Sequence, residues 1–395
     1  MLEHIRNNAN GGGFMRKKWF IHLAWLLAII MAICLISGCS NQEAEKDSIP
    51  AVSDNSVVDE ADSDTDEPDN SQEEVPGENS PVAESGEDNN EAAGNVEKPE
   101  KDLPGKSDNH DTVTLMITKD FGSQTLVEKK VQIQKNWSIF ELLESTVKIE
   151  GKWDGGFVNS INGLESQSGG FTRDGFDWFY YINGIGADVG ADQYSLRAGE
   201  VIWWDYHVWK TMGSSNSAVI GCYPQPFIHG YRGKIGATNI LAAKESTKMA
   251  QDLKNSLLNR GVRSINVKEM DNNLLENRSV PTIVVGTWSE LKGLSWLDKF
   301  NQAYRKTGIS VYFSDKGLEL LDYTGKTVQT VQNSAGVIAA AGSGLGDNSP
   351  LWLVSGTDQE GLKLAVNLLV NNPQKISKYY SAVIAADKIY RLPLK

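Results

Sequence analysis

Two aromatic segments joined by a glycine- and aspartate-rich loop constrain the fold of this chain more than any other feature. In residues 176–182 and 202–209, large side chains alternate with the two-residue period of a β-strand. A half-buried antiparallel sheet normally turns a polar face to water. The face that should be polar instead carries Phe179, Tyr181 and Trp203. We therefore expect a ligand, another domain or a partner to cover that face.

The chain around these segments, residues 111–210, is predicted to form an α+β domain of the β-grasp type. Alternating residues predict strands at 113–118 and 126–134, and Ser138 can cap a helix whose apolar side packs on the sheet. Gly151 is expected to end that helix. Because further strands follow, the order is that of one helix lying across a small mixed sheet.

Two stretches of this domain resemble a known family. Residues 178–184 (WFYYING) and 192–203 (DQYSLRAGEVIW) are similar to the smaller C-terminal domain of transcobalamin and intrinsic factor, and closer still to bacterial surface domains of that kind. The family belongs to the soluble-ligand-binding β-grasp group, whose known ligand class is cobalamin. The resemblance covers about a quarter of the chain. It does not extend to the large helical-barrel domain that forms the other half of the ligand clamp in transcobalamin.

The resemblance implies that a corrinoid binds beside the aromatic strands. A corrin ring is a broad, partly apolar disc fringed with amides, which suits a wall of rings with scattered hydrogen-bond donors. The loop 185–194 would contact its rim. An interface with the rest of the chain is the alternative explanation of the rings, and the two are not exclusive because ligand pockets favour domain interfaces. The candidate ligand-binding residues are Phe179, Tyr180, Tyr181, Asn183, Tyr194, Trp203 and His207.

Residues 218–395 are predicted to form a three-layer α/β domain with a largely parallel sheet, because strand and helix patterns alternate. Helices are predicted at 238–260, 289–306 and 357–370. In the transcobalamin relatives the ligand sits between two domains, so this domain is the candidate to close the site. We expect the loop 223–232, with Phe227, His229 and Tyr231, to face the outer aromatic side of the first domain.

Residues 1–39 are predicted to be a leader and a lipoprotein signal peptide. Met15 is the expected true start, because the glycines at 11–13 are what a purine-rich ribosome-binding site gives when translated. Basic residues, the apolar run 19–36 and small residues before Cys39 are typical of a secretory signal. The end of this segment resembles the lipobox of bacterial lipoproteins, which implies a lipid such as palmitate on Cys39. A plain membrane-spanning anchor is the alternative.

Residues 40–110 are predicted to be a disordered tether. They hold 22 acidic and 4 basic side chains and almost no large apolar ones, so they cannot bury enough surface to offset the entropy of ordering. The net charge of −13 therefore belongs to this segment, and the rest of the chain is close to neutral. Without a basic patch in the folded part, no nucleic-acid partner is expected.

The motifs of common enzyme classes are absent from the sequence. It contains no HExxH, CxxC or Gly-x-Ser-x-Gly motif, and Cys222 is the one cysteine of the folded part. We therefore expect no enzyme. The hypothesis is a lipid-anchored protein on the extracellular face of the bacterial cytoplasmic membrane, which binds cobalamin or a related corrinoid and passes it to cobalamin transporter components. The alternative is an adhesive or scaffold module that binds protein or glycan.

Overall fold

The structure is a computed structural model that describes residues 111–395, except for 154–156, 169–173 and 210–215. The predicted signal peptide, Cys39 and the acidic tether lie outside the described residues. The described residues all belong to one compact unit. Within the part of the chain that the structure describes, no helix is long and apolar enough to cross a membrane.

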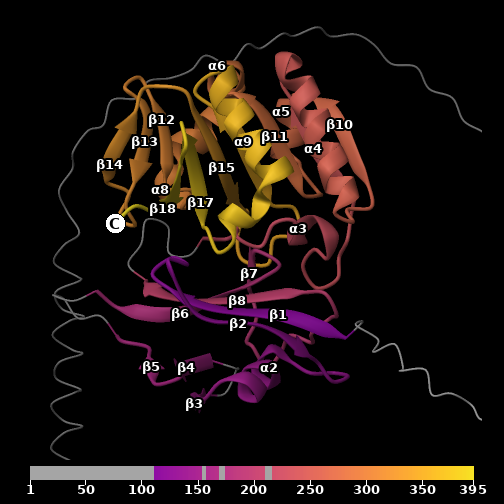
Figure 1. The fold of residues 1–395 in the computed structure, drawn as a ribbon, viewed down its shortest axis with the longest axis vertical. Coiled ribbons are helices and arrows are strands. Elements are labelled where there is room, and N and C mark those ends of the chain that lie inside the picture. The colour runs from indigo at the N-terminus through magenta and orange to yellow at the C-terminus, as the bar shows by residue number, and fades with distance from the viewer. Residues whose placement is uncertain (1–110, 154–156, 169–173, 210–215) are drawn as a thin grey trace, which may run out of the picture. The chain divides into compact units, whose positions relative to one another are not determined.

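The first domain is a β-grasp, as predicted. Its five-stranded sheet has the order β2-β1-β8-β6-β7, in which β1 and β8 are parallel and the other neighbours are antiparallel (Figure 1). The strands are β1 (Thr112–Lys119), β2 (Gln124–Gln132), β6 (Phe176–Ile182), β7 (Ile185–Gly186) and β8 (Val201–Val208), with the helix α2 (Ile139–Thr146). A second small sheet contains β3 (Ile149–Trp153), β4 (Phe157–Ile161) and β5 (Leu164–Glu165).

The helix α2 begins where the sequence predicts. The Ser138 hydroxyl accepts a hydrogen bond from the Glu141 amide, and the Glu141 carboxylate accepts one from the Ser138 amide, which is a capping box. The helix packs Ile139, Leu142 and Leu143 into the core under the sheet. The prediction of its end was wrong, because Val147 is the C-cap and Gly151 lies in β3.

The two-residue period assigns the aromatic side chains to the faces that the sequence predicts. Trp178, Ile182 and Trp204 lie in the core between the sheet and α2. Tyr181 and Trp203 lie in a separate cluster on the outer face of the sheet. Every residue of β8 is buried, so this strand is covered on both sides.

The C-terminal domain has three layers, as predicted. Its seven-stranded sheet has the order β10-β9-β11-β16-β15-β17-β18 (Figure 1). Helices α4 and α9 pack on one face of this sheet, and the other face is covered by helices α5 to α7 and by the three-stranded sheet β12-β13-β14. The strands are β9 (Thr238–Ala242), β10 (Ile265–Glu269), β11 (Thr282–Thr287), β12 (Val311–Ser314), β13 (Gly317–Leu321), β14 (Thr327–Val331), β15 (Ala335–Ala341), β16 (Leu351–Gly356), β17 (Ser381–Ala385) and β18 (Lys388–Leu392). The helices are α3 (Gln225–Ile228), α4 (Thr247–Asn259), α5 (Asn272–Glu276), α6 (Trp288–Leu291), α7 (Ser295–Gln302), α8 (Tyr304–Thr307) and α9 (Gln359–Asn371), with 3₁₀ turns η1 (Lys244–Ser246) and η2 (Pro373–Ile376).

Three details of this domain differ from the prediction. Its sheet is half parallel, because the pairings among β10, β9, β11 and β16 are parallel and those among β16, β15, β17 and β18 are antiparallel. The predicted helix 238–260 begins with strand β9, which pairs with β10 and β11, and becomes α-helical only at Thr247. The predicted helix 289–306 is divided into α6, α7 and α8.

Candidate functional site

The C-terminal domain covers the centre of the outer aromatic face. Tyr181 and Trp203 form a buried cluster with Val219, Cys222 and Tyr380. The Tyr380 ring meets Trp203 edge to face, with 5.3 Å between the ring centroids, and meets Tyr181 in the same way at 5.6 Å. Burial raises the pKa of the Cys222 thiol, so this cysteine is a packing residue.

A buried carboxylate next to this cluster joins the two domains. Asp205 is fully buried, and its Oδ2 lies 2.8 Å from His207 Nδ1 and 3.3 Å from the Tyr380 hydroxyl. The backbone amides of Phe121 and Gly122 donate to the same carboxylate at 3.0 and 2.9 Å, and the Thr118 hydroxyl also contacts it. Burial, and then the charge of Asp205, raise the pKa of Tyr380 well above its ordinary value of 10, so its hydroxyl keeps the proton that it donates.

Towards the edge of the sheet, the outer face continues as a row of rings in close contact. The His207 ring lies between Phe121 and Phe179, with centroid distances of 4.3 and 4.2 Å. Phe179 also lines a cavity at the edge of β6, so the row runs from the interdomain contact to this cavity.

This β6-edge cavity has a volume of about 590 Å³, which is within the range of small-molecule sites. Aromatic rings from both faces of the sheet line this cavity, because it opens at the edge of β6. The rim carries two exposed apolar side chains, Phe157 at 74% exposure and Leu345 at 48%. The lining residues are Phe157, Val158, Asp177, Trp178, Phe179, Tyr180, Tyr181, Gly186, Ala187, Asp188, Val189, Gly190, Gln193, Trp204, Asn216 and Leu345.

The polar side chains that line the cavity differ in how many hydrogen bonds they can still make with a ligand. The Tyr180 hydroxyl donates to the Val189 carbonyl, which fixes the loop against the strand, and burial raises its pKa. Asp188 accepts hydrogen bonds from the Tyr231 hydroxyl and from Arg232 Nη2, the latter at 3.1 Å. Gln193 makes no side-chain hydrogen bond to any described residue, so its amide can serve a ligand.

The seven predicted ligand residues divide into three groups. Phe179, Tyr180 and Tyr181 line the β6-edge cavity together with much of the predicted rim loop 185–194. Trp203 and His207 do not line the cavity and lie in contact with Tyr380, which also contacts Tyr181. The other two bind within the chain: Asn183 bridges the Val201 amide and the Gly230 carbonyl at 2.8 Å each, and the Tyr194 hydroxyl donates to Glu200 at 2.7 Å.

The cavity also contains residues that the sequence reasoning missed. Trp178 and Trp204 pack in the inner core, and only the open edge of β6 brings them to the cavity. Asn216 and Leu345 come from distant segments, and no sequence signal connects them with β6.

The loop 223–232 contacts the first domain, but not as predicted. Phe227 packs in the C-terminal core, 5.2 Å from the Trp352 ring. Tyr231 enters the core of the β-grasp domain beside Tyr194, and His229 lies against Gly199. The loop 223–232 therefore contacts the part of the first domain that contains Tyr194 and Gly199. Tyr380 instead covers the outer face of the first domain's sheet.

Within the described residues, no group of three or more His, Cys, Asp or Glu side chains could hold a metal ion.

Comparisons with known proteins match part of the first domain and name no activity for it. Residues 136–208 match the family described as "Domain of unknown function (DUF4430)". A crystal structure from Ruminococcus gnavus, described as a "putative metal binding protein", is similar at 17% sequence identity and a TM-score of 0.19; the match covers 25% of this chain and 96% of that one. No curated protein matches the chain.

Proposed function

We propose that this chain binds cobalamin or a related corrinoid, a partly apolar molecule fringed with amides, in the β6-edge cavity. The observation that carries the proposal is the placement of Phe179, Tyr180 and Tyr181 around one cavity of about 590 Å³, together with Trp178 and Trp204. Aromatic walls with few polar groups favour a flat, partly apolar molecule.

The polar groups of the cavity suit the amide fringe of a corrinoid. The unused Gln193 amide can both donate and accept hydrogen bonds, and Asp188 on the adjacent loop can accept further ones. A corrinoid is larger than a drug-sized molecule, so this cavity would hold one side of the disc. The other side would stay accessible to the protein that receives it.

The cellular part of the proposal rests on the sequence. A lipid on Cys39 would hold the protein at the extracellular face of the bacterial membrane, and residues 40–110 would let the binding domain reach its ligand. The protein would deliver the corrinoid to cobalamin transporter components and would perform no catalysis.

Calorimetric titration of the full chain with cyanocobalamin tests the proposal. We expect saturable binding that Phe179→Ala weakens by about tenfold or more, because it removes one wall of the cavity. Tyr312→Ala, which removes a ring from β12, is the matched control and should bind like the wild type. Absence of binding at millimolar protein would end the corrinoid assignment.

An adhesive or scaffold module is the second candidate, and one observation favours it. Trp203 and His207, which were candidates for ligand contact, pack against Tyr380 of the same chain. Under this alternative the cavity, with Phe157 exposed at its rim, receives an apolar side chain of a partner protein. Cyanocobalamin would then not bind.

A further inference from the structure

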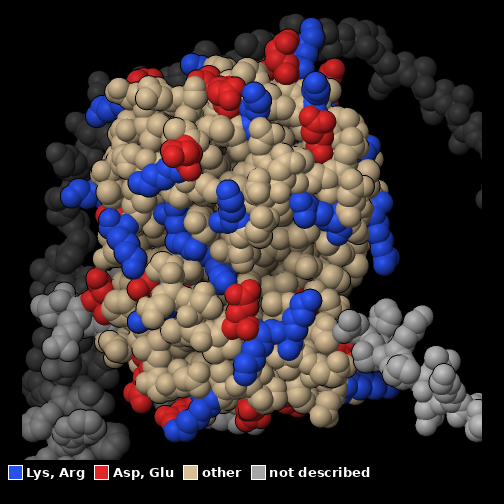
Figure 2. All heavy atoms as spheres, viewed as in Figure 1, with Lys and Arg blue, Asp and Glu red and all other residues tan. Residues whose placement is uncertain are grey.

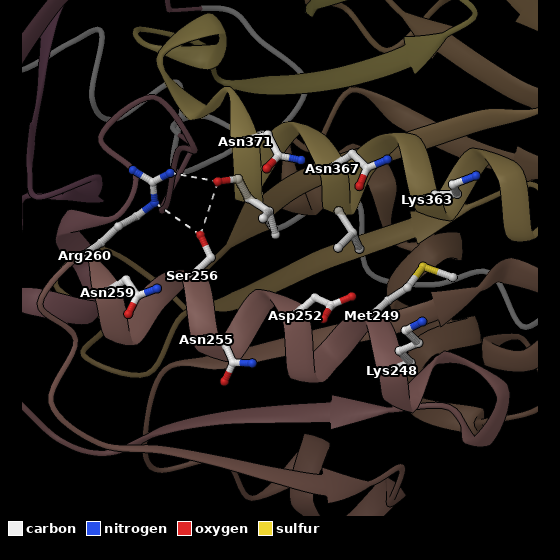
Figure 3. Close-up of a pocket in the computed structure, with 12 residues that line it drawn as sticks. Lys248, Met249, Asp252, Asn255, Ser256, Asn259, Arg260, Lys363, Asn367 and Asn371 are labelled. Atoms are coloured by element: carbon white, nitrogen blue, oxygen red, sulfur yellow. Dashed lines mark hydrogen bonds between the residues drawn. The ribbon is translucent and has the colours of Figure 1, made fainter.

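A second groove, with a volume of about 800 Å³, lies between α4 and α9 of the C-terminal domain (Figure 3). The two helices run in the same direction on one face of the sheet. Met249, Val366 and Val370 give the groove an apolar part, and the other lining side chains are polar or charged. This groove is separate from the β6-edge cavity, with which it shares no lining residue.

Four asparagines line the groove in two matched pairs. Asn255 and Asn259 lie on α4, and Asn367 and Asn371 lie on α9 (Figure 3). Four residues along a helix correspond to about 6 Å of rise. An extended peptide repeats every two residues, or about 6.6 Å. Because an amide carries both a donor and an acceptor, each asparagine can pair with the N–H and C=O groups of alternate peptide residues.

These amides have hydrogen-bonding capacity to spare. All four side chains belong to exposed residues. Asn259, Asn367 and Asn371 make no side-chain hydrogen bond to the described residues, and Asn255 accepts one from Gln251 at 3.2 Å. A ligand in the groove would therefore replace water and would not have to break existing bonds.

The charges of the groove favour an acidic ligand. Lys248 and Lys363 lie at one end, Arg260 lies at the other, and Asp252 is the one carboxylate among the lining residues (Figure 3). Arg260 is held in place, because its Nη2 donates to the Val370 carbonyl at 2.9 Å and its Nε to the Ser256 hydroxyl at 3.3 Å. On the face on which α4 and α9 lie, basic and acidic side chains are interspersed (Figure 2).

We propose that the α4–α9 groove binds an extended acidic peptide segment of a partner protein. The asparagine pairs would bind the peptide backbone, and Lys248, Lys363 and Arg260 would bind its carboxylates. From residue 248 to 260 the helix rises about 18 Å, which accommodates about five extended residues. No aromatic ring lines the groove, so it lacks the platform on which sugar rings usually stack.

Fluorescence anisotropy of the full chain with labelled ten-residue peptides tests this proposal. The first probe alternates Glu and Thr. The second alternates Glu and Pro, which keeps the charge but removes every second backbone N–H. The third alternates Lys and Thr. We expect the Glu-Thr peptide to bind about tenfold or more tightly than either of the others.

Variants then assign the binding to the groove. The pair Asn367→Ala and Asn371→Ala should weaken Glu-Thr binding by about tenfold or more, and Asn333→Ala, an exposed asparagine outside the groove, should leave it unchanged. Failure of the Glu-Thr peptide to bind at millimolar protein would overturn the proposal. Equal binding of the Glu-Pro peptide, or binding that the double variant does not reduce, would also overturn it.

Discussion

The Tyr380 hydroxyl of the C-terminal domain donates a hydrogen bond to Asp205 Oδ2 of the β-grasp sheet, with 3.3 Å between the two oxygens. This bond joins the two domains at a buried carboxylate. The ring of Tyr380 packs on Trp203 beside this bond. Tyr380 therefore both donates to the buried Asp205 carboxylate and covers the outer aromatic face. We therefore expect this interface to contribute to the free energy of unfolding.

Tyr380→Phe should lower the free energy of unfolding by about 1–3 kcal/mol, because it removes a donor from a buried charge while keeping the ring in place. Urea denaturation followed by tryptophan fluorescence measures the change. Tyr312→Phe is the control, since its hydroxyl bonds to Gln302 at an exposed site, and we expect its effect to stay within about 0.5 kcal/mol. Equal stability of Tyr380→Phe and wild type would show that the Tyr380–Asp205 bond does not stabilise the interface.

Glu200 should make stability depend on pH. Burial raises the pKa of Glu200 above its ordinary value of 4.5, although hydrogen bonds from Tyr194 and Arg197 oppose this. The folded protein therefore holds this proton more tightly than the unfolded chain, and the contribution of Glu200 to stability is largest below pH 4.5 and is lost as the pH rises through the folded-state pKa.

Glu200→Gln removes this titration. We expect its unfolding free energy, measured in urea between pH 4 and 7, to fall less steeply with rising pH than that of the wild type. Parallel pH profiles for the two proteins would contradict the assignment. Glu360→Gln, an exposed site on α9, should leave the profile unchanged.

Replacing Asn183 by alanine should destabilise the folded protein. Asn183 begins the turn between β6 and β7 at φ 54°, followed by Gly184 at φ 85°, and its side chain bonds to both Val201 and Gly230. Asn183→Ala loses both hydrogen bonds, and these bonds are what hold the residue at a positive φ. We therefore expect the free energy of unfolding to fall by about 2–4 kcal/mol. Asn183→Gly accepts the backbone conformation and should destabilise by less. Thermal unfolding of the two variants measures the difference, and a larger loss for glycine would refute this account.

The β-grasp domain could be predicted because its local signals agree with the fold. The period of two in β6 and β8, the capping box at Ser138 and the Asn183-Gly184 turn all specify structure over short distances. The C-terminal domain was harder. Residues 240–243 form a short apolar run that is followed by α4 without a glycine or proline, and such a run does not distinguish a buried strand from a helix.

The candidate site could be predicted only in part, for a related reason. Alternation identified the face that something must cover, but it does not identify what covers it. That role falls to Tyr380, far along the chain, and no local pattern marks it. The cavity beside Phe179 depends on the open edge of β6 and on contacts with Asn216 and Leu345, which are properties of the assembled fold.

A crystal structure of the chain grown with cyanocobalamin tests directly whether the β6-edge cavity binds a corrinoid. We expect the corrin to lie in this cavity, in contact with Phe179 and Tyr180, with Tyr380 still packed on Trp203. Cobalamin bound elsewhere, or bound to the outer face after displacing Tyr380, would contradict this expectation.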